Sequence, residues 1–437
     1  MSDYPNADGR TPLMDAHKPT MDALSGRGIL GLCRTVPAGM TSGSDTANLS
    51  ALGYDPVKYY TGRSPLEAAS MRIPLADTDI TYRCNLVTVS NEPDYQQKTM
   101  IDYSAGEIST AEAAVLIRHL AEHMRMPGYK LYNGVSYRHC LVRSVECEGQ
   151  LLGIRYQVLG NSCHDPDQIQ ASGRLPIGGG AAKRSVASTG GTMTQEWCSL
   201  ELVPPHDITG RPVAGHLPEE DSDIYKFMAS SYGLLAGHEV NRKRIAAGKN
   251  PANSAWIWGE GKKAALTAFR EKTGYSGAII SAVDLLKGIG VSAGMDVIDV
   301  EGATGNLDTN FEGKADAAFD ALAANDFVFI HVEAADECGH HGDYAGKVKA
   351  IEYLSERLLK RLLARLDAAK TEYCVLMMPD HVTPVATRKH AGDPVPFAFY
   401  DSAKSYAGAP YNEQNAAKGM FVDKGHEMIG MFFKRFL

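Results

Sequence analysis

The C-terminal half of the sequence alternates between short apolar runs and longer stretches in which apolar residues recur every three or four positions. The apolar runs predict strands at Met295–Val300, Phe327–Val332, Tyr373–Met378 and Pro396–Tyr400. The periodic stretches predict helices at Gly261–Lys272, Gly277–Gly290, Gly313–Ala324, Ala345–Lys370 and Gly425–Phe436. Buried strands separated by helices indicate an α/β fold with a parallel-rich sheet that helices cover on both faces.

The N-terminal part is less regular. Pro12–Gly26 predicts a short helix with a break at Lys18-Pro19, Gly28–Val36 predicts a strand, and Asp45–Leu52 predicts a helix. The chain therefore opens without a strand ahead of its first helix. That is unusual, because the first strand of an α/β protein commonly lies in the centre of the sheet.

The middle of the chain has a different pattern of apolar and polar residues. Short alternating runs at Asp79–Val89 and Leu151–Leu159 predict strands, and Thr110–Met124 predicts a helix that begins after a Ser/Thr cap. This pattern indicates a smaller α+β domain inserted into the main one. We expect a discontinuous core domain of residues 1–74 and 251–437, and an inserted, substrate-holding domain of residues 75–250.

Length and composition narrow the class of protein. A chain of 437 residues is too long for one ordinary core, which agrees with two domains. The net charge of −8 and the absence of a basic block argue against nucleic acid as a partner. No apolar run is long enough to cross a bilayer, and no secretory pattern opens the chain. Eight cysteines without CxxC pairs favour reduced thiols and a cytoplasmic location.

Acidic residues and histidines come after the predicted strands. Asp336 and His340 stand four residues apart after one strand, Asp380 and His381 come directly after the next, and His390 lies further on. Ligands of parallel sheets bind beyond the carboxyl ends of the strands. Carboxylates and neutral imidazoles suit Mn²⁺ or Zn²⁺. The pattern predicts a divalent metal site, with His341 as a bystander or outer-shell group and His331 in the core.

Ser44 comes after Gly43 at the start of a predicted helix and allows two interpretations. Ser44 or Asp45 could simply cap the helix. Alternatively, Ser44 could be a nucleophile, because backbone N–H groups at a helix N-terminus favour an attached phosphate and a bound metal would lower the hydroxyl pKa. Arg63 could bind a phosphate or carboxylate through two hydrogen bonds of its guanidinium, or it could be a solvated loop arginine.

Several longer motifs point to one family. They are Gly43–Leu49, Leu52–Pro56, Tyr60–Ala69, Trp258–Lys263, Val283–Gly290, Asp336–His340, Asp380-His381, and His390 with Pro394–Pro396. With these motifs the chain resembles the cofactor-independent phosphoglycerate mutases of the archaeal type, members of the alkaline phosphatase superfamily. The resemblance implies an alkaline-phosphatase-like fold and interconversion of 3-phosphoglycerate and 2-phosphoglycerate in glycolysis or gluconeogenesis, independent of 2,3-bisphosphoglycerate.

The resemblance also implies a cofactor and roles for particular residues. It implies two divalent metals, Mn²⁺ first and Zn²⁺, Co²⁺ or Mg²⁺ as alternatives, and a phosphoserine intermediate on Ser44. Asp336, His340 and His390 match the ligands of one metal, whereas Asp380 and His381 match ligands of a second metal that also touches the serine. The substrate, a small phosphorylated three-carbon acid, would be bound by Asn48 and by three residues that match less closely, Arg63, Asp165 and Lys262.

The chain departs from the family at its start. The family opens with an apolar strand ending in Gly-Asp-Gly-Met, whose Asp ligates the second metal, whereas Met1–Pro5 aligns with the family's residues just after that Asp. Asp3 and Asp8 are nearby carboxylates, but no pattern places either on the metal. We therefore expect weak binding of the second metal, reduced or absent mutase activity, a gap in the sheet and lower stability.

Two alternatives stay open at this point. One is a related metal-dependent phosphotransferase, such as a proposed homoserine kinase, although the sequence shows no nucleotide-phosphate loop. The other is an inactive binding homologue that keeps the fold and one metal. The oligomeric state is left open by the sequence.

Overall fold

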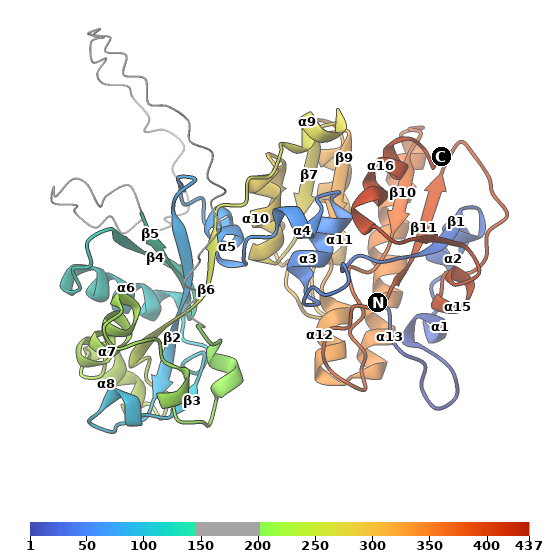
Figure 1. Cartoon of the computed structure of the whole chain (residues 1–437). Helices are drawn as coiled ribbons and strands as arrows, with labels where there is room; N and C mark the ends of the chain where they lie inside the picture. Colours follow the sequence, from blue (N-terminus) through green and yellow to red (C-terminus); the bar gives the residue numbers. More distant parts are fainter. Residues whose placement is uncertain (145–201, 437) are drawn as a thin grey trace, which may run out of the picture.

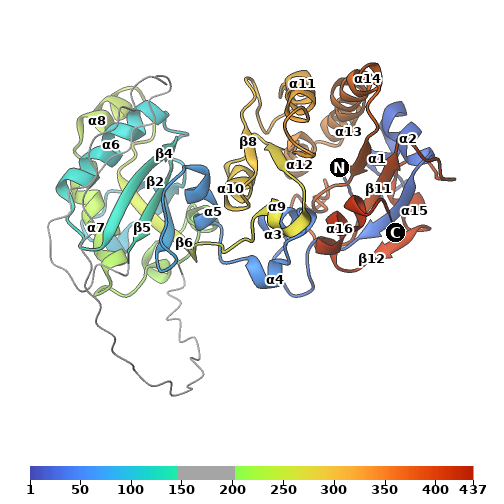
Figure 2. The same ribbon diagram turned by 90° about the horizontal axis from the view of Figure 1, so that it is seen from above.

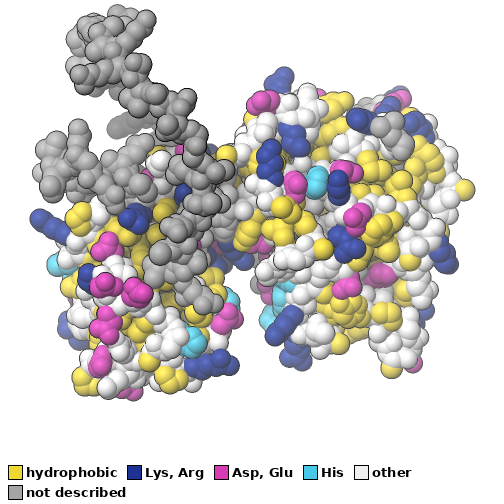
Figure 3. Space-filling view, viewed as in Figure 1, with side chains coloured by type: hydrophobic (Ala, Val, Ile, Leu, Met, Phe, Trp, Pro, Cys, Tyr) yellow, Lys and Arg dark blue, Asp and Glu magenta, His cyan; other side chains and the backbone are white. Residues whose placement is uncertain are grey.

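The protein folds into two lobes, seen side by side in Figure 1. The computed structural model describes residues 1–144 and 202–436. In the space-filling view the lobes remain distinct bodies, and side chains of both charges are interspersed on the visible face of the larger lobe (Figure 3). None of the helices in the described residues is long and apolar enough to cross a membrane.

The larger lobe contains a parallel sheet of the kind that the sequence predicts. Its strands are β7 (Gly277–Ile280), β8 (Asp296–Ile298) and β9 (Phe327–Ile330), in the order β8-β7-β9. Both neighbouring pairs run parallel, with Ala278 opposite Asp296 and Val328.

A second sheet in the same lobe is mixed, which the sequence did not predict. It consists of β1 (Ile29–Cys33), β10 (Cys374–Met377), β11 (Val395–Asp401) and β12 (Met420–Val422), in the order β10-β11-β1-β12. β11 is antiparallel to both β10 and β1, whereas β1 and β12 are parallel. β10 and β11 are joined by a loop without a crossover helix, so the chain returns antiparallel.

Helices cover both faces of these sheets (Figure 2). The N-terminal part supplies α1 (Pro12–Asp15), α2 (Pro19–Gly26), α3 (Ser44–Ala51), α4 (Pro56–Tyr59) and α5 (Ser64–Ser70). The C-terminal part supplies α9 (Phe269–Thr273), α10 (Asp284–Ser292), α11 (Phe311–Ala321), α12 (Ala334–His341), α13 (Tyr344–Tyr353), α14 (Lys360–Ala368), α15 (Glu413–Ala416) and α16 (Met428–Phe433). The long helix predicted at Ala345–Lys370 is α13 and α14, which a π-helical segment at Leu354–Leu359 joins.

Two helix predictions are wrong. Residues predicted as the helix Gly261–Lys272 divide between the end of strand β6 (Ser254–Lys262) and the short helix α9. Residues predicted as the helix Gly277–Gly290 divide between strand β7 and helix α10. A short apolar run does not distinguish a buried strand from a buried helix by its periodicity alone, and that ambiguity explains both errors.

The smaller lobe is built on strand β2 (Ile80–Val89). β2 pairs antiparallel with β5 (Arg138–Arg143), β6 and β3 (Met100–Asp102), and β5 pairs with β4 (Tyr129–Val135). The helices of this lobe are α6 (Thr110–His123), α7 (Asp223–Leu235) and α8 (Glu239–Ala246). α6 begins with the expected cap, a capping box between Ser109 and Glu112.

The smaller lobe differs from the predicted inserted domain in two respects. α7 and α8 were not predicted, and the predicted strand Leu151–Leu159 lies outside the described residues. β6 is hydrogen-bonded to β2, although the predicted boundary at residue 250 assigned its residues to the core domain. Backbone pairing of a distant strand leaves no signal in the local pattern, so this contact of β6 with the smaller lobe could not be read from the sequence.

The two sheets of the larger lobe do not meet. Among the described residues β9 pairs only with β7, and β10 pairs only with β11. A cavity of about 990 Å³ lies between them, lined by every residue of both strands. The gap that the sequence predicted is therefore present.

Candidate active site

Asp336 and His340 share one face of helix α12, directly after β9. The helix spans eight residues and ends at Gly342, whose φ of 74° suits glycine. The spacing of four residues brings the two side chains together, with 3.2 Å between Asp336 Oδ2 and His340 Nε2.

Asp380, His381 and His390 reach the same place from the loop between β10 and β11. An isolated bridge between Val382 and Ala391 folds this loop back on itself, so that His390 returns to His381. His390 Nε2 lies 2.8 Å from His340 Nε2 and 3.7 Å from Asp336 Oδ2. The strand-end residues that the sequence singled out thus form one cluster.

The cluster fits a divalent cation. Ligand atoms of Asp336, His381 and His390 all lie within 4.8 Å of one another, and His340 adjoins both Asp336 and His390. One carboxylate and several imidazoles form a donor set that Zn²⁺ or Mn²⁺ accepts. The geometric group includes His381, whereas the family resemblance assigned His381 to the second metal.

A second metal position has fewer donors. Asp380 Oδ2 lies 3.4 Å from His381 Nε2, and Ser44 Oγ lies 3.0 Å from the same nitrogen. Within residues 1–144 and 202–436, Asp380 belongs to no group of three histidine, cysteine or acidic side chains with ligand atoms this close.

Neighbouring hydroxyl and carbonyl groups orient the residues of the cluster. Thr383 Oγ1 donates to Asp336 Oδ1, and Thr35 Oγ1 donates to the carbonyl oxygen of Asp380. His340 Nδ1–H donates a hydrogen bond of 3.0 Å to the carbonyl oxygen of Arg388, and Nε2 therefore faces the cluster. Thr35 and Thr383 were not predicted from the sequence, because a lone threonine carries no motif.

The charges of the cluster are strongly coupled. Burial opposes ionisation of Asp336, but hydrogen bonds from His340 and His390 hold the pKa of its carboxyl far below the usual range. The hydrogen bond to Asp336 is also the main reason why the pKa of His340 rises to about 9. At neutral pH His340 is therefore cationic, with a proton on both ring nitrogens. A metal must displace the proton on Nε2, because only the neutral imidazole is a ligand.

Ser44 is the first residue of α3 and faces the cluster. Its Oγ lies 3.0 Å from Nε2 of His381, whose side chain is buried. Gly43 is the N-cap and has no side chain to cap the helix. Asp45 accepts a hydrogen bond of 2.9 Å from the backbone N–H of Thr46 in the first turn, and another of 2.7 Å from the Tyr60 hydroxyl. The cap interpretation therefore fits Asp45, whereas Ser44 faces the cluster.

The residues assigned to the substrate side are dispersed. Asn48 Nδ2 donates to Asp380 Oδ2 (3.0 Å) and to the Ser44 carbonyl oxygen (2.8 Å), so it supports the cluster directly. Arg63 precedes α5 and binds Glu67, and the backbone of Lys262 at the end of β6 binds Thr61. Both lie at the junction of the two lobes, and Asp165 lies outside the described residues.

Two further titratable residues adjoin the cluster. Glu333 precedes α12, and burial, reinforced by repulsion from Glu337 and Asp336, raises its pKa to about 7. His331 comes directly after β9, and burial lowers its pKa to about 4. Both line the cavity between β9 and β10. The sequence had placed His331 in the core and had not singled out Glu333.

Asp3 lies in a buried ion pair next to the cluster. Its Oδ2 accepts a 2.8 Å hydrogen bond from Lys347 Nζ, which also donates to the carbonyl oxygens of Ser2 and Thr383. Asp3 thus ties the N-terminal segment to the loop that carries the ligands, and its carboxylate is already paired. Asp8 is exposed.

Comparisons with known proteins agree with this geometry. A model of the family described as 2,3-bisphosphoglycerate-independent phosphoglycerate mutase matches residues 25–170. A protein of Methanosarcina barkeri with that name is 41% identical, over 99% of this chain and 97% of its own length.

Two solved structures share the fold. A protein from Pyrococcus horikoshii superposes with a TM-score of 0.72 at 25% identity, covering 99% of this chain and 94% of that one. A cofactor-independent phosphoglycerate mutase from Thermoplasma acidophilum superposes with a TM-score of 0.58 at 24% identity, covering 100% and 96%. The expected alkaline-phosphatase-like α/β fold is confirmed. Given the 41% identity over nearly the whole length, the chain belongs to the family of 2,3-bisphosphoglycerate-independent phosphoglycerate mutases.

Proposed function

We propose that the protein interconverts 3-phosphoglycerate and 2-phosphoglycerate, without 2,3-bisphosphoglycerate, through a phosphoserine on Ser44. The observation that carries the proposal is the position of Ser44. Its hydroxyl lies 3.0 Å from His381 within the Asp/His cluster and at the N-terminus of α3. An isomerase of this family needs a nucleophile beside a site that can neutralise a phosphate.

We assign one metal to Asp336, His340 and His390, with Mn²⁺ as the first candidate. When bound, a divalent ion neutralises phosphate charge and lowers the pKa of a neighbouring hydroxyl. Asp380 and His381 are the donors for a second ion, which we expect to bind more weakly because only the Ser44 hydroxyl joins them.

The first half-reaction transfers the phosphoryl group to the protein. Ser44 Oγ loses its proton and attacks phosphorus in line, so that a phosphorus–oxygen bond forms to Oγ and the bond to the glycerate oxygen breaks. The glycerate oxygen takes up the proton that Ser44 lost and becomes a hydroxyl, while glycerate stays bound. The N-terminus of α3 directs backbone N–H groups towards the phosphoserine. Asn48 donates hydrogen bonds to both Ser44 and Asp380 and so fixes their relative positions.

The second half-reaction returns the phosphoryl group to the other hydroxyl of glycerate. Glycerate must stay bound while it reorients, and we assign this task to Arg63, Lys262 and Asp165. Arg63 and Lys262 come from the junction of the lobes, where closure would exclude water from the phosphoserine. No water is consumed and no bisphosphate is needed.

Glycolysis or gluconeogenesis in the cytoplasm is the setting that we propose for this reaction. The five cysteines within the described residues are unpaired, which supports a reducing compartment. A homoserine kinase or another phosphotransferase is not favoured, because relatives about 40% identical over nearly the whole chain carry the name of a mutase.

The decisive experiment is conversion of 3-phosphoglycerate to 2-phosphoglycerate, coupled to enolase, on metal-stripped protein with added Mn²⁺ and no 2,3-bisphosphoglycerate. We expect reduced activity, because the second ion binds weakly, and this activity should depend on Mn²⁺ and be abolished by Ser44→Ala. Ser42→Ala, in the loop just before α3, is the matched control and should keep its activity. Activity that survives Ser44→Ala would refute the phosphoserine mechanism, and Mn²⁺-dependent phosphate release without isomerisation would indicate a phosphatase.

A further inference from the structure

Two arginines at the junction of the lobes, Arg63 and Arg83, share one carboxylate and are called the arginine pair below. Glu67 of α5 accepts a 3.0 Å hydrogen bond from Arg63 Nε through Oε1 and a 2.8 Å hydrogen bond from Arg83 Nε through Oε2. Helix α5 contacts β2 and β6 of the smaller lobe as well as α10 of the larger lobe (Figure 1). Within residues 1–144 and 202–436, the terminal nitrogens of both guanidiniums have no hydrogen-bond partner.

The side chain of Arg83 is held on several sides. Its guanidinium carbon lies 3.9 Å from the ring centroid of Trp258, the residue opposite it on β6. The indole Nε1 of Trp258 donates a 3.0 Å hydrogen bond to Asn85 Oδ1, which fixes the ring. A Cβ at the neighbouring Gly259 would lie only 3.2 Å from Arg83 Cδ, so glycine leaves room for the arginine. The orientation of the guanidinium is therefore set before a ligand binds.

The positive charge of Arg83 is incompletely balanced. Its side chain is only 10% exposed, and the carboxylate of Glu67 that faces it is shared with Arg63. The other charges that act most strongly on Arg83 are those of Arg63 and Arg138, which are positive. Burial and these two cations lower the pKa of Arg83, although Glu67 opposes the shift. A buried cation in such surroundings favours the binding of a further anion.

The arginine pair lies close to the helix that carries the candidate nucleophile. The Tyr60 hydroxyl donates a 2.7 Å hydrogen bond to Asp45, the residue after Ser44. Burial raises the pKa of Tyr60, and the positive charges of Arg63 and Arg83 oppose this shift, so both guanidiniums lie near this hydroxyl. Only the side chain of Tyr60 thus separates the arginine pair from the residue that follows Ser44.

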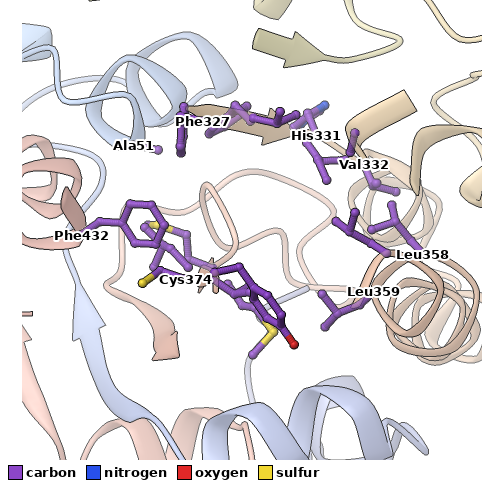
Figure 4. Close-up of a pocket in the computed structure, with 18 of the residues that line it drawn as sticks. Ala51, Phe327, His331, Val332, Leu358, Leu359, Cys374 and Phe432 are labelled. Carbon is purple, nitrogen blue, oxygen red and sulfur yellow. The ribbon is translucent and has the colours of Figure 1, made fainter. Parts of the chain in front are cut away.

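The apolar cavity between β9 and β10 offers no comparable cation beside the cluster. Figure 4 shows this cavity with Phe327 and Val332 among its lining residues. Arg435 also lines it but interacts with Cys374 at the start of β10, whereas Asp380 comes after the end of that strand. The carboxylate of a substrate whose phosphate lies at the cluster must therefore find its cation elsewhere.

Building on the proposed function, we propose that Arg83 binds the carboxylate of glycerate through its two terminal nitrogens and so selects substrates that carry a carboxylate. The phosphate must lie at Ser44, so the carboxylate is the charged group left to reach the arginine pair. A guanidinium matches a carboxylate with two parallel hydrogen bonds. The carboxylate takes no part in phosphoryl transfer, so holding it keeps glycerate bound while its two hydroxyls exchange places at the phosphoserine.

The test measures binding without turnover, in the Ser44→Ala protein loaded with Mn²⁺. Isothermal titration compares 3-phosphoglycerate with glycerol 3-phosphate, which keeps the phosphate and the middle hydroxyl but has a hydroxymethyl group in place of the carboxylate. The protein should bind 3-phosphoglycerate about tenfold more tightly, or better. Adding Arg83→Gln should abolish this preference, because the affinity for 3-phosphoglycerate falls while that for glycerol 3-phosphate stays within about twofold.

Two further variants separate a direct contact from a general effect of charge or folding. Arg83→Lys keeps a positive charge over Trp258 but loses the paired hydrogen bonds, so it should fold and still lose most of the preference. Arg138→Gln removes a neighbouring, exposed charge and should keep the preference. Unchanged binding of glycerol 3-phosphate shows that a variant is folded.

The outcomes distinguish this inference from the proposed function. A preference for 3-phosphoglycerate that survives in Arg83→Lys and Arg83→Gln would overturn the assignment of Arg83 alone. Equal weakening of both ligands by Arg83→Lys would do the same, because Arg83 would then support the phosphate or the fold. If the Ser44→Ala protein binds neither ligand, the proposed function fails and this inference fails with it.

Discussion

At the scale of single residues, the candidate site depends on atoms that only a few neighbours hold in position. His340 is fixed through Nδ1 to the carbonyl oxygen of Arg388, and its other nitrogen meets His390 at 2.8 Å. His341, next in the sequence, is exposed and takes no part in the cluster. Of these two adjacent histidines, only His340 is positioned to bind a metal in the cluster.

This contrast predicts the behaviour of a matched pair of variants. His340→Gln should weaken Mn²⁺ binding at least tenfold, about 1.4 kcal/mol, because it removes one of the converging nitrogens. His341→Gln should bind the metal as the parent protein does. Isothermal titration of metal-stripped protein measures both. Equal affinities for the two variants would show that His340 is not a ligand.

A second residue-scale prediction concerns the buried His139 of the smaller lobe, far in sequence from the cluster. Its Nδ1 accepts from the Gly134 amide, its Nε2 finds no hydrogen-bond partner within the described residues, and burial lowers its pKa to about 3. The unfolded chain binds a proton near pH 6.5 and the folded chain does not. The free energy of unfolding should therefore fall as the pH falls from 6.5 towards 3.

His139→Gln should remove this loss, so that the parent protein loses about 2–3 kcal/mol more than the variant between pH 7 and pH 4.5. Urea unfolding at both pH values measures the difference. His123→Gln, at an exposed position of α6, is the control and should behave like the parent. Parallel pH profiles for the parent and His139→Gln would contradict the assignment.

At the scale of elements, the site depends on how short segments are joined. α12 comes after β9 without a long loop, and the bridge between Val382 and Ala391 returns the β10–β11 loop to its start. Near the junction of the lobes, helices α5 and α10 pack so closely that Gly288 meets the backbone of Leu66. This contact supports α5, directly after Arg63.

The close packing of α5 and α10 gives an element-scale prediction. A Cβ at Gly288 would overlap the carbonyl group of Leu66, so Gly288→Ala should destabilise the protein by about 1–3 kcal/mol. Gly233→Ala, in helix α7, is the control because nothing lies within 4 Å of its Cβ position. Better helix propensity should make that change neutral or stabilising by up to about 1 kcal/mol. Thermal unfolding compares them, and an unchanged Gly288→Ala would mean that α5 and α10 can separate freely.

At the scale of the whole molecule, the Asp/His cluster is assembled from both sides of the cavity between β9 and β10. Asp336 comes after β9 on one side, whereas Asp380 and His381 come after β10 on the other. Binding of a metal would therefore hold the two sheets together. Metal occupancy and global stability should be linked.

Removal of the metal tests this link. After treatment with EDTA, added Mn²⁺ should raise the melting temperature, with about 2.7 kcal/mol of stabilisation at a free concentration one hundred times the Kd. The tight phase should saturate at one equivalent per chain, because Asp380 joins no group of three ligands within the described residues. Tight binding of two equivalents by the parent chain would contradict the prediction. His340→Gln should lose the tight phase.

Local chemistry could be read from the linear sequence. The convergence of Asp336 with His340, and of Asp380 with His381, could be predicted because strand ends and a spacing of four residues are visible in the linear order. The break at Lys18-Pro19 and the cap at Ser109 were equally readable, since they depend on adjacent residues. The separation of β9 from β10 in the described residues agrees with the gap in the sheet that we expected.

Only the tertiary structure decided which segments meet. The pairing of β6 with β2, the antiparallel course of β11 and the hydroxyls of Thr35 and Thr383 at the ligands all depend on contacts between distant parts of the chain. The linear pattern carries no record of such contacts, because one apolar run can pair with many others. Asp3 shows the same limit: its type suited a metal, but the buried Lys347 decided its role.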